Sequence, residues 1–195
     1  MKRDTHVAYL SLGSNLGDRL AMLRAAVQEL LEHPALRIDL ARDVASLYET
    51  SPIGGPPDQP PYFNSVLRVQ TSLSPADLLA VALSIETSLG RLRCDRWEPR
   101  IVDIDLLFVG DLVIDSPMLT LPHPRLHERR FVLEPLSELA ADLIHPLTGV
   151  SIGAMADGLR PSRAADAVTR IAGTEWIFDL QEVHPTAKSL HHYAQ

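Results

Sequence analysis

The sequence contains a single cysteine, Cys94, among 195 residues, and it contains no long run of apolar residues. A lone cysteine excludes an internal disulfide framework and suits a reducing compartment. The apolar stretch near the start, Val7–Leu12, is shorter than the core of a signal peptide. No stretch approaches the roughly 20 apolar residues of a membrane span. We therefore expect a cytoplasmic protein that does not contact a membrane.

Basic charge is also scarce, because 18 lysines and arginines stand against 25 aspartates and glutamates, for a net charge of −7. This balance argues against a protein whose whole surface binds nucleic acid or an anionic membrane. The sequence also lacks a Gly-x-x-x-x-Gly-Lys-Ser/Thr segment, which excludes a P-loop nucleotide site. What remains, with 46% apolar and 22% charged residues, is the composition of a globular protein of one-domain size.

Periodicity and turn signals predict strands that alternate with helices. Strands are expected at residues 7–12, 38–50 (whole or broken), 62–71 and 101–109, and helices at 20–31, 74–90 and 130–142. Hairpin-type connections accompany the helices, so we predict an α+β fold with one antiparallel sheet and helices on one face. The Gly13–Gly17 segment reads as a turn that caps the first helix.

An Asp-x-Asp segment in the last predicted strand carries the strongest chemical signal. Side chains alternate along a strand, so Val102, Ile104, Leu106 and Phe108 should share an apolar face. Asp103 and Asp105 then point the other way, about 7 Å apart. Two such carboxylates repel unless a cation joins them, and their hard oxygens suit Mg²⁺. The alternative is a solvated face with two ordinary acids.

Cationic segments flank this strand on both sides. The upstream segment, residues 90–100, has four arginines against two acids, and guanidinium groups match phosphate oxygens in bidentate fashion. The downstream segment, residues 121–131, adds further arginines together with His123 and His127. These histidines lack a third ligand at zinc spacing. The residues therefore favour a magnesium-dependent enzyme that transfers a phosphoryl-type group. The alternative is that the upstream arginines form an ordinary solvated loop that binds no ligand.

A second candidate pocket lies in the strand at 62–71. Tyr62 and Asn64 should share the face of the aspartates if Phe63 points toward the helices. An aromatic ring beside a carboxamide can stack on a flat heterocycle and hydrogen-bond its amide edge. The alternative is a surface tyrosine beside a turn asparagine.

Four segments of the chain together resemble a known family, the 6-hydroxymethyl-7,8-dihydropterin pyrophosphokinases. The resemblance spans about residues 7–147, and the matching segments are Ala8–Arg19, Tyr48–Gly54 with Asp58–Pro60, Arg96–Asp105 and Pro122–Leu133. It implies a ferredoxin-like fold and transfer of pyrophosphate from MgATP to the pterin hydroxymethyl group, releasing AMP, in folate synthesis. It assigns residues 1–160 to this domain and leaves 161–195 as a C-terminal extension, partly ordered or mobile.

The resemblance also implies roles for individual residues. Two Mg²⁺ ions are expected on Asp103 and Asp105, and these acids are expected to act in catalysis with Arg91 and Arg100. The expected nucleotide-binding residues are Glu86, Arg91, Arg100, His123 and Arg129. The expected pterin-binding residues are Thr50, Pro52, Ile53, Tyr62, Asn64, Trp97 and Phe131, with Arg93 and Trp97 in a mobile loop. Glu98 departs from the family's glycine in that loop.

Two alternative functions would also be consistent with an Asp-x-Asp segment on a ferredoxin-like sheet. A glycosyltransferase can hold a metal and a nucleotide sugar on Asp-x-Asp, but 195 residues are few for that class. The other is a non-catalytic ferredoxin-like module that binds RNA or a regulatory ligand. Such a module would carry aromatic and basic side chains on its open sheet, whereas two acids are expected there. The resemblance implies ATP and a reduced pterin as partners, and we further expect no nucleic acid and a monomer or weak dimer.

Overall fold

The computed structural model describes residues 5–52, 59–90, 100–159 and 168–181. An antiparallel sheet runs through it in the order β5-β1-β4-β3-β8, and a short strand β2 also pairs with β4. The strands of this sheet are β1 (His6–Ser14), β2 (Leu36–Arg37), β3 (Leu47–Thr50), β4 (Tyr62–Thr71), β5 (Asp103–Val109) and β8 (Val168–Ala172). A separate hairpin joins β6 (Ile114–Asp115) to β7 (Thr120–Leu121).

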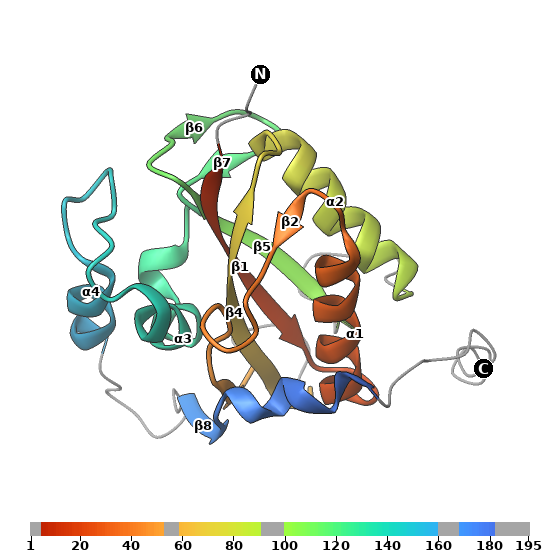
Figure 1. Ribbon diagram of the computed structural model, residues 1–195. Coiled ribbons are helices and arrows are strands. Elements are labelled where there is room, and N and C mark those ends of the chain that lie inside the picture. The colour runs from red at the N-terminus through yellow and green to blue at the C-terminus, as the bar shows by residue number, and fades with distance from the viewer. Residues whose placement is uncertain (1–4, 53–58, 91–99, 160–167, 182–195) are drawn as a thin grey trace.

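Two helices, α1 (Arg19–Glu32) and α2 (Pro75–Ser88), lie side by side on one face of the sheet (Figure 1). The Asp18 carboxylate caps α1 by accepting from the Ala21 N–H, and Ser74 caps α2. Their apolar sides pack on alternate residues of the central strands. This core contains Leu10, Leu12, Leu23, Val27, Leu30, Leu67, Val69, Leu78, Ala82 and Ile104.

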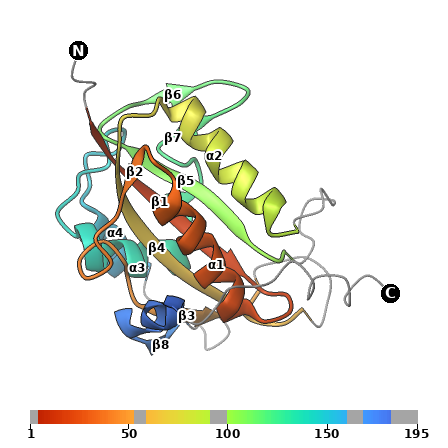
Figure 2. The same ribbon diagram turned by 45° about the vertical axis from the view of Figure 1, so that its right-hand side comes forward.

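A second pair of helices, α3 (Arg130–Ala140) and α4 (Ile152–Gly158), packs together beyond the other face of the sheet (Figures 1 and 2). The 3₁₀ turn η1 (Leu126–Glu128) leads into α3. The apolar side chains of this layer are Tyr9, Val66, Phe108, Leu126, Val132, Leu133, Leu136 and Ile152. The predicted α+β class and antiparallel sheet are confirmed, with α1 and α2 on one face as expected; the sequence did not predict the layer on the other face.

The predicted alternation along β5 is wrong at one residue. Tyr9 pairs with Phe108 but the next residue, Leu10, pairs with Leu106, so Leu107 is an extra residue in β5. Such a bulge reverses the phase of every side chain beyond it. Phe108 therefore leaves the face of Ile104 and packs edge-on against Tyr9, with the ring centroids 6.4 Å apart.

The structure differs from the predicted elements in two segments, one where a strand was expected and one where no element was predicted. Of the strand expected at 38–50, only the last four residues form a strand, β3. An isolated bridge between Val44 and Leu67 precedes it. Residues 168–181 form β8 and a 3₁₀ helix, η3 (Thr174–Gln181), which packs beside α1. The division of the chain at residue 160 stays a prediction. Among the described residues, no helix is long and apolar enough to cross a membrane.

Candidate active site

The two aspartates of β5 lie on the same side of the strand, and each meets its own guanidinium group. Arg100 Nη1 lies 2.5 Å from Asp103 Oδ2, and Arg129 Nη1 lies 3.3 Å from Asp105 Oδ2. The aspartate side chains are 23% and 37% exposed, so both remain open to a ligand. The structure thus brings together four of the residues predicted for metal and phosphate binding.

The charge balance around these carboxylates favours a bound cation. Burial and the neighbouring Asp103 carboxylate raise the pKa of Asp105, and the Arg129 and Arg100 charges only partly oppose this. Burial lowers the pKa of Arg100, but the Asp103 carboxylate, with smaller contributions from Asp105 and Tyr62, raises that pKa overall. Within the described parts of the chain, no cluster of three or more His, Cys, Asp or Glu side chains could hold a metal. Mg²⁺ fits this pair, because it needs only one or two carboxylates when phosphates and water complete its shell.

His123 lies beside Arg129, and its ring is neutral. Burial and the Arg129 charge lower the pKa of His123 to about 4. Its Nδ1 accepts from the Arg125 N–H at 3.2 Å. Nε2 lies 3.9 Å from Asp105 Oδ2 and 3.3 Å from Arg129 Nη1. The neutral His123 ring therefore places a polar group beside Asp105 and Arg129 without adding a charge.

Glu86, near the end of α2, contacts the backbone of β5, the strand that carries both aspartates. Its side chain is 1% exposed, and Oε1 accepts from the backbone N–H of Ile104 at 2.7 Å. Ile104 lies between the two aspartates on β5, an edge strand of the sheet. A buried N–H without a partner would be costly, so this carboxylate fixes the strand that carries both acids.

The residues predicted for the acceptor pocket lie on β3 and β4. Asn64 Nδ2 donates to Thr50 Oγ1 at 2.7 Å, and both side chains are buried. Burial raises the pKa of Tyr62, with smaller effects of the Arg100 and Asp103 charges, so this ring lies near that charged pair. Tyr62 and Asn64 are therefore on the side of the aspartates, as the alternation predicts.

Gly13 lies between the aspartates of β5 and the predicted acceptor pocket on β3 and β4. The sequence pattern did not identify it as a site residue. It pairs with Asp103 on one side and with Asn64 on the other, since β1 lies between β5 and β4. A Cβ at this position would lie 3.3 Å from Asn64 Oδ1. The missing side chain leaves room on the sheet between the carboxylate and the carboxamide. Two strand spacings separate these residues by about 10 Å.

The turn after Gly13 has a role that the sequence assigned wrongly. Asp18, rather than the predicted Gly13–Gly17 turn, caps α1. Asn15 Oδ1 instead accepts from the Arg100 N–H at 2.7 Å, and the Asn15 N–H donates to Arg100 O at 3.1 Å. Ser14 Oγ donates to Ile101 O at 2.6 Å. This turn therefore fixes the backbone from which the Arg100 side chain reaches Asp103, a contact between distant segments that no local pattern reveals.

The remaining predicted residues are placed only in part. Pro52 lies half-buried just after β3, and Phe131 lies in the first turn of α3 with the Arg129 guanidinium 5.7 Å from its ring centre. Ile53, Arg91, Arg93 and Trp97 fall outside the described residues.

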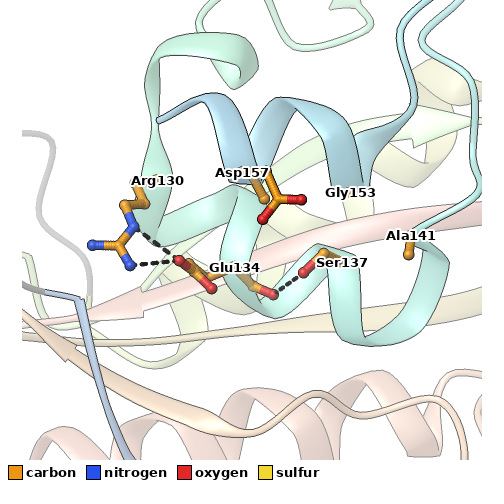
Figure 3. A pocket seen from close by; sticks show the side chains of 7 residues that line it. Arg130, Glu134, Ser137, Ala141, Gly153 and Asp157 are labelled. Carbon is orange, nitrogen blue, oxygen red and sulfur yellow. Dashed lines mark hydrogen bonds and ion pairs between the residues drawn. The ribbon is translucent and has the colours of Figure 1, made fainter. Parts of the chain in front are cut away.

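A pocket of about 490 Å³ opens between α3 and α4 (Figure 3). It is lined by Arg130, Glu134, Ser137, Ala141, Gly153, Ala156 and Asp157. Its arginine already pairs with Glu134 at 2.7 Å, as the dashed lines in Figure 3 show. None of these residues belongs to the candidate site.

Paired carboxylates ringed by arginines on an antiparallel sheet are typical of metal-dependent transferases that act on phosphate groups. The sequence model of the 7,8-dihydro-6-hydroxymethylpterin-pyrophosphokinases matches residues 9–141. A 2-amino-4-hydroxy-6-hydroxymethyldihydropteridine pyrophosphokinase of Methylorubrum extorquens is 46% identical over 137 residues, which are 70% of this chain and 84% of that protein. The chain therefore belongs to the 7,8-dihydro-6-hydroxymethylpterin-pyrophosphokinase family.

Longer proteins contain the same domain. A folic acid synthesis protein of Pneumocystis carinii is 41% identical over 149 residues, which are 76% of this chain but only 20% of that protein. A crystal structure of the Plasmodium falciparum HPPK-DHPS protein with pteroate matches 81% of this chain and 43% of its own, with a TM-score of 0.63 and 17% identity. At that identity the likeness supports the fold alone.

Family membership confirms several predictions made from the sequence. The ferredoxin-like fold is confirmed, and so is an ATP-dependent enzyme of folate synthesis that transfers pyrophosphate to a hydroxymethyldihydropterin. ATP is the co-substrate and Mg²⁺ the metal of this family. The glycosyltransferase and RNA-binding alternatives are not supported.

Proposed function

We propose that Asp103 and Asp105 would hold the Mg²⁺ that accompanies ATP, with two ions expected, while Arg100, Arg129 and His123 would bind the phosphate oxygens. The paired carboxylates, with the raised pKa of Asp105, are the observation that carries this proposal. When bound, the ions neutralise charge that develops on the transferred group. Arg91, from outside the described residues, is proposed as a further phosphate ligand and catalytic residue.

The two guanidinium groups have a further task before the nucleotide binds. Each one pairs with an aspartate and so limits the repulsion between the two acids. A guanidinium group binds phosphate oxygens as readily as it binds a carboxylate, so Arg100 and Arg129 can serve either partner. We infer that both arginines would leave their aspartates and bind phosphate oxygens when MgATP is present, so that the two carboxylates become free to hold the metal.

The pterin is proposed to bind at the β3–β4 side of the sheet. Asn64 and Thr50 would hydrogen-bond its amide edge with Pro52 and Ile53 nearby, and Tyr62 and Phe131 would stack on its faces. Gly13 leaves room for the hydroxymethyl group between this pocket and Asp103. The protein's main contribution is then alignment of the acceptor oxygen with the bond that breaks.

Two further groups complete the proposed site. Arg93 and Trp97 would belong to a loop that closes over both substrates. Glu86 is proposed to support nucleotide binding through the Ile104 backbone, on which the positions of both aspartates depend.

Product analysis tests the reaction directly. Purified protein, MgATP and 6-hydroxymethyl-7,8-dihydropterin should give AMP and the pterin diphosphate in equal amounts. A mixture in which a sugar nucleotide replaces ATP is the matched control and should give neither. ADP in place of AMP, or no pterin diphosphate, would contradict the proposed transfer.

We also propose that the enzyme acts in the cytoplasm as a monomer or weak dimer, without nucleic acid. The single cysteine and the net charge of −7 support these statements. Light scattering at micromolar protein concentration checks the oligomeric state, and a stable tetramer would contradict it.

A further inference from the structure

The C-terminal residues extend the sheet on the side of the acceptor pocket. β8 pairs antiparallel with β3, with Val168 opposite Thr50 and Thr169 opposite Glu49. β4 pairs with the other side of β3. The strand that carries Thr50 therefore has partners on both edges, and one of them lies beyond the 9–141 stretch matched by the family.

Trp176, in η3, anchors this added segment. Its side chain is 3% exposed, and its indole N–H donates to Ala45 O at 2.9 Å. The same carbonyl accepts from Ser65 Oγ at 3.0 Å, and Arg24 Nε donates to Trp176 O at 2.6 Å. One tryptophan thus ties together α1, β4 and the residues that enter β3.

β3 needs such support because it is short. It has four residues and three pairs with β4, from Tyr48–Asn64 to Thr50–Tyr62. A strand of this length at a free edge would fray, because few hydrogen bonds resist its opening. The 2.7 Å bond between Asn64 and Thr50 depends on the alignment of these two strands.

We propose that β8 and η3 act as a clamp that positions β3 for acceptor binding, with Trp176 as its positioning residue. This inference rests on the proposed roles of Thr50 and Asn64. Because β5 lies at the opposite edge of the sheet, the clamp should affect pterin binding and leave the phosphate-binding groups unchanged.

Trp176→Phe in the full chain tests the clamp, since it removes the indole donor and keeps a buried ring. We expect the KM and Kd for the pterin to rise about fivefold, the value for one lost hydrogen bond. The Kd for MgATP and kcat should stay within about twofold. Amide exchange in β3 should accelerate while that in β5 does not change.

Two other variants complete the test. Thr169→Pro breaks the β8–β3 ladder at an exposed residue and should reproduce the pterin defect even if the tryptophan variant is too unstable to measure. Phe178→Ser, at a residue 58% exposed on η3, is the matched control and should change nothing.

Three results would overturn the inference. Pterin and nucleotide affinities that fall together would indicate a general loss of stability. Unchanged pterin affinity in both Trp176→Phe and Thr169→Pro would show that β3 needs no clamp. A wild-type protein that binds no pterin would overturn the proposed acceptor itself, and this outcome is seen before any variant is made.

Discussion

The two halves of the candidate site are built from different interactions. On the β5 side, charged groups oppose one another, with Arg100 beside Asp103 and Arg129 beside Asp105, at partly exposed side chains. On the β3–β4 side, neutral groups pair, since Asn64 donates to Thr50 and both are buried.

This difference matters because charges and neutral hydrogen bonds respond differently to a ligand. A charged pair on a partly open surface can exchange one partner for a metal or a phosphate with little change of backbone. A buried neutral pair has few spare partners, so its donors and acceptors must already be correctly placed. We therefore expect the β5 side to tolerate small movements and the acceptor side to depend on strand alignment.

The largest effect should come from Asp103→Ala or Asp105→Ala. Each removes a proposed metal ligand, and kcat should fall at least about a hundredfold even with ample Mg²⁺. Because the raised pKa of Asp105 shows that its charge is disfavoured in the fold, Asp105→Asn should keep or raise the melting temperature. Initial rates and circular dichroism melting check both points. Near-normal turnover in either alanine variant would contradict the metal assignment.

Asn64→Ala should have the next largest effect, and only on the acceptor side. It leaves pterin groups unpaired, which costs about 1–3 kcal/mol or about ten- to a hundredfold in affinity. MgATP binding should barely change. Calorimetric titration with each ligand separately measures the difference, with a non-hydrolysable ATP analogue present for the pterin. If the variant loses affinity for the nucleotide instead, the assignment of Asn64 to the pterin pocket is wrong.

Substitutions of Glu86 test whether its carboxylate acts through the backbone of β5 or through its negative charge. Glu86→Ala leaves the Ile104 N–H unpaired and should weaken metal-dependent nucleotide binding about tenfold. Glu86→Gln keeps an acceptor oxygen and should stay close to wild type. Mg²⁺ titration of nucleotide binding and exchange of the Ile104 amide are the measurements. Equal defects in both variants would indicate that the negative charge of Glu86 acts on the ligand.

The smallest predicted effect is at the boundary between the two halves. Gly13→Ala places a methyl group 3.3 Å from Asn64 Oδ1, so the carboxamide must shift by a few tenths of an ångström. We expect the pterin KM to rise about threefold, within the range of a weakened hydrogen bond, with unchanged KM for ATP. Gly158→Ala has no atom within 4 Å of its new Cβ and serves as the control. An ATP defect in Gly13→Ala would show that the methyl group acts on β5 instead.

Much of the fold and of the site could be predicted from local sequence patterns. The strand Tyr62–Thr71 was predicted with its observed bounds, and helix α2 begins after the predicted cap at Ser74. These elements follow from alternation, capping and helical spacing, which depend on neighbouring residues only. The layer of α3 and α4 on the second face could not be predicted, because helical periodicity shows that a helix has an apolar side but not which sheet face it covers.

The sequence by itself determined the chemical groups and the side of each strand on which they lie, because side-chain direction alternates within the strand. It therefore predicted Asp103 with Asp105, and Tyr62 with Asn64. Only the tertiary structure decided which groups meet across strands: Asn15 with the Arg100 backbone, Glu86 with Ile104, and Trp176 with Ala45. These contacts join residues far apart in the chain, so they depend on sheet order, on the bulge at Leu107 and on close packing rather than on any local pattern.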